Sequence, residues 1–179
     1  MQNIYPGEKV NERASFTKYT DEPRNQGKVA YLILDARFEK VRQGGIVQGA
    51  AVLVAAGVGL DGKRQIISVS VALSEQEAHW RQFLKSLVER GLAGVRLIVS
   101  DDHGGLKAAR QAVFGSVPWQ RCQFHLQQNA QAHVPKQEMK AQVAAALRAI
   151  FTATDRQAAE TLLRAMVNKY EQTAPKLAA

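Results

Sequence analysis

The chain has 179 residues, enough for one domain with a hydrophobic core and too few for two large ones. Hydrophobic residues make up 46% of it and charged residues 22%, as in ordinary soluble globular proteins, and no apolar run approaches the roughly 20 residues that span a membrane. The formal net charge is +8, and the single cysteine, Cys122, excludes an internal disulfide. The N-terminus lacks the layout of a signal peptide, so we expect a cytoplasmic protein.

The positive charge is the first indication of function. A basic surface attracts polyanions, and neutralising phosphates releases counterions, which supplies most of the non-specific affinity of proteins for DNA. Many basic proteins bind no nucleic acid, so the charge favours DNA binding without establishing it.

The first expected elements are three strands in a meander. Residues 1–28 mix prolines, glycines and nearly balanced charges without a sustained period, which indicates a loose N-terminal extension. The apolar run 29–34 then predicts a strand buried on both faces, which ends on Asp35. Turns at Gly44-Gly45 and Asp61-Gly62 separate it from two further strands, at 46–57 and 65–73.

A helix is expected after the meander. Ser74 and Glu77 fit a capping box, and an apolar stripe at helical spacing then runs from Trp80 to Val88, before Gly91 ends the helix. Trp80 could stack on a base, but its place in the stripe favours a position in the core.

The remaining elements complete an α/β pattern. A fourth strand is expected at 95–99, a helix at 106–114 and a short fifth strand at 117–122. Three helices should follow, at 123–133, 136–151 and 155–173, with Pro135 between the first two and Asp155 as an N-cap. This order is typical of a ribonuclease-H-like mixed sheet with flanking helices.

Two aspartates stand at the ends of strands that lie side by side in such a sheet. Asp35 closes the first strand and Asp101 follows the fourth. Taken separately, each is explained as a turn or helix-cap residue. Taken together they predict a metal site, because Mg²⁺ binds hard carboxylate oxygens and two such ions can activate and stabilise the oxygens of a phosphodiester reaction. We expect the neighbouring Asp102 to cap the next helix instead.

Three blocks of the chain resemble those of the Mutator family of transposases, which are widespread in bacterial insertion sequences. They are residues 31–42 around Asp35, the Ser-Asp-Asp-His-Gly-Gly-Leu-Lys block at 100–107, and the Cys-x-x-His pair of Cys122 and His125. The resemblance extends from about residue 29 to about residue 169. Several blocks in the right order make it more specific than any single motif.

The resemblance implies a DDE-type DNA transposase. Such enzymes use an Asp, Asp, Glu triad with Mg²⁺ or Mn²⁺ to hydrolyse a phosphodiester at the transposon end, and then join the freed 3′-hydroxyl to target DNA. Asp35 and Asp101 match the first two members of the triad. The family also implies DNA as the partner, a homo-oligomer for the full-length protein, and a location at the bacterial nucleoid when it is bound to DNA.

The third acid of the family follows a helical insertion after the Cys-x-x-His block. We therefore expect residues 29–134 to form a partial catalytic core and 135–179 to begin the insertion, which would leave the chain truncated and inactive alone. Three acids on the closing helices could replace the missing one, but each is more simply a solvated helix residue. They are Glu138, Glu160 and Glu171.

The other marked residues have two interpretations each. Cys122 and His125 could be half of a zinc site, but a structural zinc needs four ligands and no second pair has suitable spacing, so a structural role is favoured. Four cations close in sequence to the aspartates are candidate DNA contacts or solvated surface. They are Arg37, Lys40, Arg42 and Lys107.

Two other functions remain open at this point. One is a non-catalytic DNA-binding or regulatory fragment that associates with full-length transposase. The other is a free-standing ribonuclease-H-like nuclease that is completed by Glu138 or another local acid.

Overall fold

The computed structural model describes residues 29–43 and 45–178, and the expected loose extension at 1–28 lies outside the described residues. The chain divides into two compact units, a sheet unit that ends at Arg121 and a helical unit that begins at Cys122. The boundary expected at 134/135, between a catalytic core and an insertion, derives from the family resemblance and stays a prediction.

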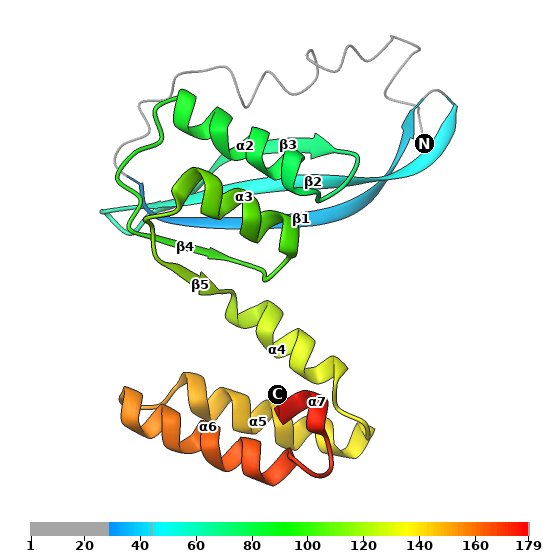
Figure 1. The fold of residues 1–179 in the computed structure, drawn as a ribbon, viewed down its shortest axis with the longest axis vertical. Helices are drawn as coiled ribbons and strands as arrows, with labels where there is room; N and C mark the ends of the chain where they lie inside the picture. Colours follow the sequence, from blue (N-terminus) through cyan, green and yellow to red (C-terminus); the bar gives the residue numbers. More distant parts are fainter. Residues whose placement is uncertain (1–28, 44, 179) are drawn as a thin grey trace. The chain divides into compact units, whose positions relative to one another are not determined.

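The sheet unit contains a mixed sheet of five strands (Figure 1). Their order across the sheet is β3-β2-β1-β4-β5. The pairs β1–β2 and β2–β3 are antiparallel, whereas β4 runs parallel to β1 and β5 runs parallel to β4. This confirms the predicted ribonuclease-H-like mixed sheet. The strands are β1 (Val29–Gln43), β2 (Ile46–Gly59), β3 (Arg64–Ala72), β4 (Leu97–Ser100) and β5 (Trp119–Arg121).

Two helices, α2 (Glu77–Glu89) and α3 (Gly104–Phe114), cover one face of the sheet and pack against each other (Figure 1). The helix α2 connects β3 to β4, and α3 connects β4 to β5. Both connections join parallel strands and cross the sheet in the same direction, so right-handed crossovers place both helices on the same face.

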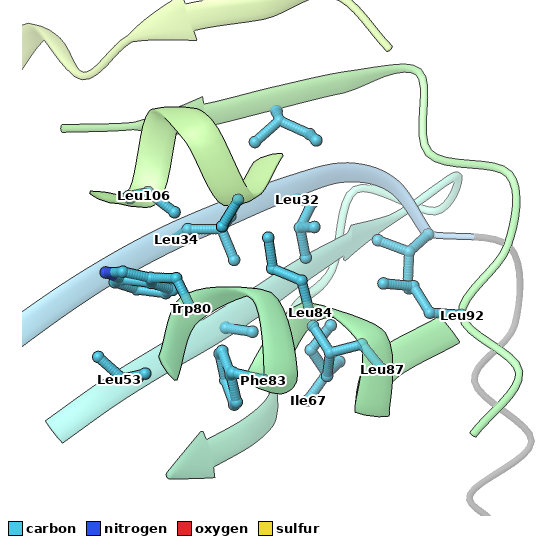
Figure 2. Close-up of a cluster of buried hydrophobic side chains, with 14 of the residues drawn as sticks. Leu32, Leu34, Leu53, Ile67, Trp80, Phe83, Leu84, Leu87, Leu92 and Leu106 are labelled. Atoms are coloured by element: carbon cyan, nitrogen blue, oxygen red, sulfur yellow. The ribbon is translucent and has the colours of Figure 1, made fainter. Parts of the chain in front are cut away.

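The core lies between these helices and the sheet. The side chains of β1 alternate between the two faces, and Leu32 and Leu34 point toward the helices and are fully buried. Figure 2 shows them against Trp80 and Leu84 of α2 and Leu106 of α3. Trp80 is 0% exposed, which confirms its expected place in the core.

The start of α2 differs from the capping-box prediction. The N-cap is Gln76, which makes no side-chain capping bond, and the helix begins at Glu77. Ser74 lies outside the helix, where its hydroxyl is 3.2 Å from Nδ1 of His79. A local motif gave the wrong cap because this side-chain contact holds Ser74 in another position. Val88 is also 44% exposed, so the apolar stripe ends one residue earlier, at Leu87.

The helical unit has a small core of its own. Its elements are α4 (Gln123–Ala132), the 3-10 turn η1 (Gln137–Met139), α5 (Lys140–Phe151), α6 (Arg156–Tyr170) and α7 (Pro175–Ala178). The core residues are Val134, Val143, Leu147, Met166, Tyr170 and Ala174. No helix within 29–43 and 45–178 is long and apolar enough to span a membrane.

The predicted N-cap at Asp155 is confirmed. Its Oδ1 accepts a hydrogen bond of 2.8 Å from the backbone N–H of Ala158, in the first turn of α6. This bond favours the ionised carboxylate and holds the pKa of Asp155 below its ordinary value.

Candidate metal centre

Asp35 does not close its strand, contrary to the sequence-based expectation. The strand β1 continues to Gln43, because it stays paired with β2 as far as the Gln43–Ile46 pair. Only its pairing with β4 stops early, at the Leu34–Ser100 pair. Asp35 is therefore the first residue of β1 beyond the parallel pairing, and Asp101 is the first residue after β4.

This register brings the two aspartates to the same level of adjacent strands. Neighbouring strands lie about 4.8 Å apart, a spacing at which two carboxylates can share one cation. Oδ1 of Asp35 accepts the N–H of Ala36 at 2.9 Å, and Oδ1 of Asp101 accepts the N–H of Asp102 at 2.5 Å. Asp35 is exposed and Asp101 is half-buried. An accessible pair of backbone-oriented carboxylates fits the hard oxygen donors that Mg²⁺ and Mn²⁺ prefer.

Trp119 fixes the backbone beside Asp101. Its indole N–H donates to Oγ of Ser100 at 2.9 Å, and that hydroxyl donates to the carbonyl oxygen of Asp101 at 2.7 Å. Ser100 is 1% exposed, so both bonds are shielded from water. This role of Trp119 was not anticipated from the sequence, although a partly buried indole N–H usually finds a partner.

Asp102 is not the cap of α3, because the N-cap position belongs to His103. Its carboxylate instead lies 2.8 Å from Nζ of Lys107 and 3.9 Å from Nη1 of Arg121. The hydrogen bond from Lys107 and the two nearby cations hold the pKa of Asp102 below its ordinary value, against a smaller opposing effect of burial. Two cations thus share one carboxylate directly beside Asp101, and Arg121 was not anticipated from the sequence.

The two helices meet closely where the Asp101 loop enters α3. A Cβ atom added at Gly105 would lie 2.3 Å from the carbonyl oxygen of Glu75 and 2.9 Å from the backbone nitrogen of Glu77. Both neighbours are backbone atoms, so they cannot rotate away as a side chain could. Glycine is required here because the start of α3 touches the segment that leads into α2.

We predict that Gly105→Ala destabilises the sheet unit by about 1–3 kcal/mol, the range for an overpacked site. The matched control is Gly104→Ala, since a Cβ atom there meets nothing within 4 Å. This control should be neutral or stabilising by less than about 1 kcal/mol. Urea unfolding followed by tryptophan fluorescence measures both, and equal stability of the two variants would contradict the close contact.

A third acid does not join the two aspartates within 29–43 and 45–178, where no group of three or more His, Cys, Asp or Glu side chains could hold a metal ion. Glu138, Glu160 and Glu171 all belong to the helical unit. Glu160 is engaged by Arg156 at 2.7 Å. We therefore assign none of these three acids to the candidate metal centre.

Cys122 and His125 lie at the start of α4, in the helical unit, and both are half-buried. In the described residues they belong to no cluster that could hold a metal ion. Their structural role in the chain remains a prediction.

Comparison with known proteins identifies the family of the chain. The family model for transposases of the Mutator family matches residues 10–179. The transposase for insertion sequence element IS406 of Burkholderia multivorans is 56% identical over 155 residues, which are 87% of this chain and 40% of that protein. The transposase for ISRM5 of Rhizobium meliloti is 45% identical over 148 residues, 83% of this chain and 37% of that protein. This chain thus spans about two fifths of the length of these relatives.

Solved structures show a more distant likeness. The HTLV-2 integrase catalytic core domain in complex with magnesium is 10% identical, with a TM-score of 0.34 over 72% of this chain and 90% of that one. The Drosophila P element transposase strand transfer complex is 12% identical, with a TM-score of 0.37 over 77% and 45% of the two chains. The sequence matches, which cover nearly the whole chain, show that it belongs to the Mutator family of transposases.

Proposed function

We propose that this chain carries the first two metal-binding carboxylates of a DDE-type DNA transposase, the enzyme that cuts transposon DNA and joins it to a target. The observation that supports this most strongly is the register of β1 and β4. Asp35 and Asp101 follow the last parallel pair, Leu34 and Ser100, and so lie at the same level, Asp35 within β1 and Asp101 directly after β4. Asp35 and Asp101 would hold Mg²⁺ or Mn²⁺ there.

A bound ion would supply Lewis-acid stabilisation of the charge that develops on phosphate oxygens. Other residues of the chain would position Asp101 and set the charge around the two carboxylates. The hydrogen bonds from Trp119 through Ser100 hold the backbone of Asp101 in place. Lys107 and Arg121 balance Asp102 and leave one net positive charge beside the carboxylate pair, which favours an approaching phosphate.

DNA is the proposed partner, and the proposed contacts are the four cations near the aspartates. Their surroundings differ. Lys107 is held by Asp102, and Nε of Arg37 lies 2.5 Å from a carboxylate oxygen of Glu39. Within the described residues, Lys40 and Arg42 have no ion-pair partner. We also propose that the full-length protein is a homo-oligomer and that it associates with the nucleoid through DNA.

By itself the chain supplies two carboxylates, and losing a ligand harms the geometry on which two-metal catalysis depends. We therefore propose that it does not cut DNA alone. This separates the proposal from a free-standing nuclease, which would nick duplex DNA when Mg²⁺ or Mn²⁺ is added.

A chimera tests the proposed function directly. This chain would replace the matching segment of the Burkholderia multivorans relative, whose other parts supply the remainder of a transposase. We expect the chimera to move a marked transposon with the ends of that relative, while the chain alone does not. A soluble chimera that leaves transposition at the background level would overturn the proposal and would favour a regulatory role.

A further inference from the structure

The strands β1 and β2 extend well beyond the rest of the sheet. The last pair between β2 and β3 is Ala51 with Ala72, and Ala51 also pairs with Phe38 of β1. Past this point β1 and β2 pair only with each other, up to Gln43 and Ile46. Residues 38–43 of β1 and 46–51 of β2 therefore form a two-stranded ribbon with the Phe38–Ala51 pair at its base, which we call the arm (Figure 1). Six residues per strand give it a length of about 20 Å.

The two faces of the arm differ in charge. Strand alternation places Phe38, Lys40 and Arg42 on one face, and the register adds Val47 and Gly49 of β2 to it. We call this the basic face. All five residues are exposed, and among the described residues neither Lys40 nor Arg42 is neutralised by an acid.

The opposite face carries no comparable net charge. Arg37 and Glu39 lie there, and their ion pair of 2.5 Å cancels the two charges. The arm thus presents two unneutralised cations in one direction only. This asymmetry argues against an arm that is merely solvated, because solubility alone does not require the charges to be on one face.

The position opposite Lys40 is open to close approach. Its cross-strand partner is Gly49, and a Cβ atom built there would meet nothing within 4 Å. A glycine inside a strand weakens the strand and often marks a place where a ligand or another backbone comes close. Beside it, Phe38 and Val47 are 61% and 53% exposed, which makes them available for apolar contact with a partner.

We propose that the arm is a nucleic-acid-binding ribbon that lies in a groove of duplex DNA through its basic face. The major groove, about 12 Å wide, admits a two-stranded β-ribbon, and exposed apolar side chains such as Phe38 can contact thymine methyl groups there. Lys40 and Arg42 would contact phosphates at the groove edge, and the bare backbone at Gly49 lets the ribbon lie close to the DNA. A protein partner is less favoured because the two cations would have to be neutralised across the contact.

The basic face and the proposed metal centre lie on different faces of β1. Lys40 and Arg42 lie five and seven residues beyond Asp35 along β1, which corresponds to about 17 and 23 Å. Strand alternation places Asp35 with Arg37 and Glu39, on the face opposite to the basic face. The arm is therefore a DNA contact separate from the proposed metal centre, and the inference rests on the proposed function only in taking DNA as the partner.

The test compares the removal of two charges from the arm with the removal of two charges from the hairpin between β2 and β3, at the other end of β2. Lys40→Gln with Arg42→Gln removes two charges from the arm, and Lys63→Gln with Arg64→Gln removes two exposed charges from the hairpin at the other end of that strand. Binding to a fluorescein-labelled DNA duplex of about two helical turns is followed by anisotropy at several salt concentrations. Excess EDTA keeps the measurement independent of metal at Asp35 and Asp101.

We expect the arm variant to bind more weakly and to lower the slope of log Kobs against log[salt] by about 1.8, or about 0.9 for each lost phosphate contact. The hairpin variant should leave the slope within about 0.5 of the wild-type value. Equal effects of the two variants would reduce the result to net charge and overturn the inference, as would an unchanged arm variant. If wild type elutes as a dimer on size-exclusion chromatography and the arm variant as a monomer with intact DNA binding, the inference is overturned in favour of contact between copies of the chain.

Failure of this test would leave the proposed function standing, because metal binding and transposition of the chimera do not depend on it. Conversely, loss of metal binding in an Asp35 variant without any change in EDTA-insensitive DNA binding would leave the arm standing.

Discussion

Replacing Trp80 with alanine should lower the free energy of unfolding of the sheet unit by about 3–5 kcal/mol. Trp80 is 0% exposed and fills the space between α2 and the sheet, where Figure 2 shows it against Leu34, Leu53 and Leu106. Because the free energy of unfolding of small domains is only about 5–15 kcal/mol, this variant should be close to unfolding at room temperature. Urea unfolding measures the change, and the only other tryptophan, Trp119, reports on the sheet unit by fluorescence.

Two controls separate the packing of Trp80 from its polar atom. The indole nitrogen of Trp80 is buried without a hydrogen-bond partner in the described part of the chain, at a cost of about 1–3 kcal/mol. Trp80→Phe removes that cost while it keeps a ring, so it should destabilise much less than alanine. Val88→Ala, at an exposed position of the same helix, should change stability by less than about 0.5 kcal/mol. An alanine variant at Trp80 as stable as the one at Val88 would contradict the assignment of the core.

Asp35→Asn or Asp101→Asn should weaken Mn²⁺ binding by at least about tenfold. Changes to groups that merely orient a metal ligand cost about 10–100-fold in affinity, so the loss of one of two direct ligands should reach at least the lower end of that range. Titration of Mn²⁺ followed by electron paramagnetic resonance measures free and bound ion directly. In the chimera with the relative, the same substitutions should reduce transposition to background.

The matched control for this substitution is Asp61→Asn. Asp61 is exposed on the turn between β2 and β3, at the other end of β2 from the arm, so its replacement makes the same change in net charge away from the site. Metal affinity in this variant should stay within about threefold of wild type, a difference of less than about 0.7 kcal/mol. A similar loss of Mn²⁺ affinity in Asp61→Asn and Asp35→Asn would mean that the affinity depends on the overall charge of the protein and not on a ligand at Asp35.

The neighbourhood of Asp35 and Asp101 was predictable because it depends on strand order. Buried parallel strands read as continuous apolar runs, and the polar residue after each run marks the edge at which such strands end their pairing. Both runs are present, at Val29–Leu34 in β1 and around Ile98 in β4, and their pairing follows the expected topology. The polar residues after the two runs, Asp35 in β1, Ser100 at the end of β4 and Asp101 directly after it, are therefore placed by the pattern.

The length of β1 was not predictable in the same way. From Phe38 onward β1 forms the two-stranded arm and runs beyond the core, so its residues carry charges in place of an apolar alternation. Its pairing is maintained by backbone hydrogen bonds with β2, which leave little trace in the side chains. The mistaken cap at Ser74 has a related cause, since His79 competes for the Ser74 hydroxyl and no local motif includes that competition.

The supporting residues of the site were missed because they depend on tertiary register. Trp119 reaches Ser100 only because β5 lies beside β4, and Arg121 reaches Asp102 for the same reason. Residues with these roles are far apart in the sequence, at spacings that match no motif. The sequence marked the ligands of the proposed metal, and the structure adds the side chains that hold the backbone at Asp101 and pair with its neighbour Asp102.

A double-mutant cycle of Mn²⁺ affinity tests most directly whether Asp35 and Asp101 bind one ion. Wild type, the two single asparagine variants and the double variant are titrated under the same conditions. If both carboxylates hold the same ion, each single variant already loses most of the binding, and the double variant is little weaker than either. Independent, additive losses from the two substitutions, or unchanged affinity in either single variant, would contradict a shared metal centre at the point where the pairing of β1 with β4 ends.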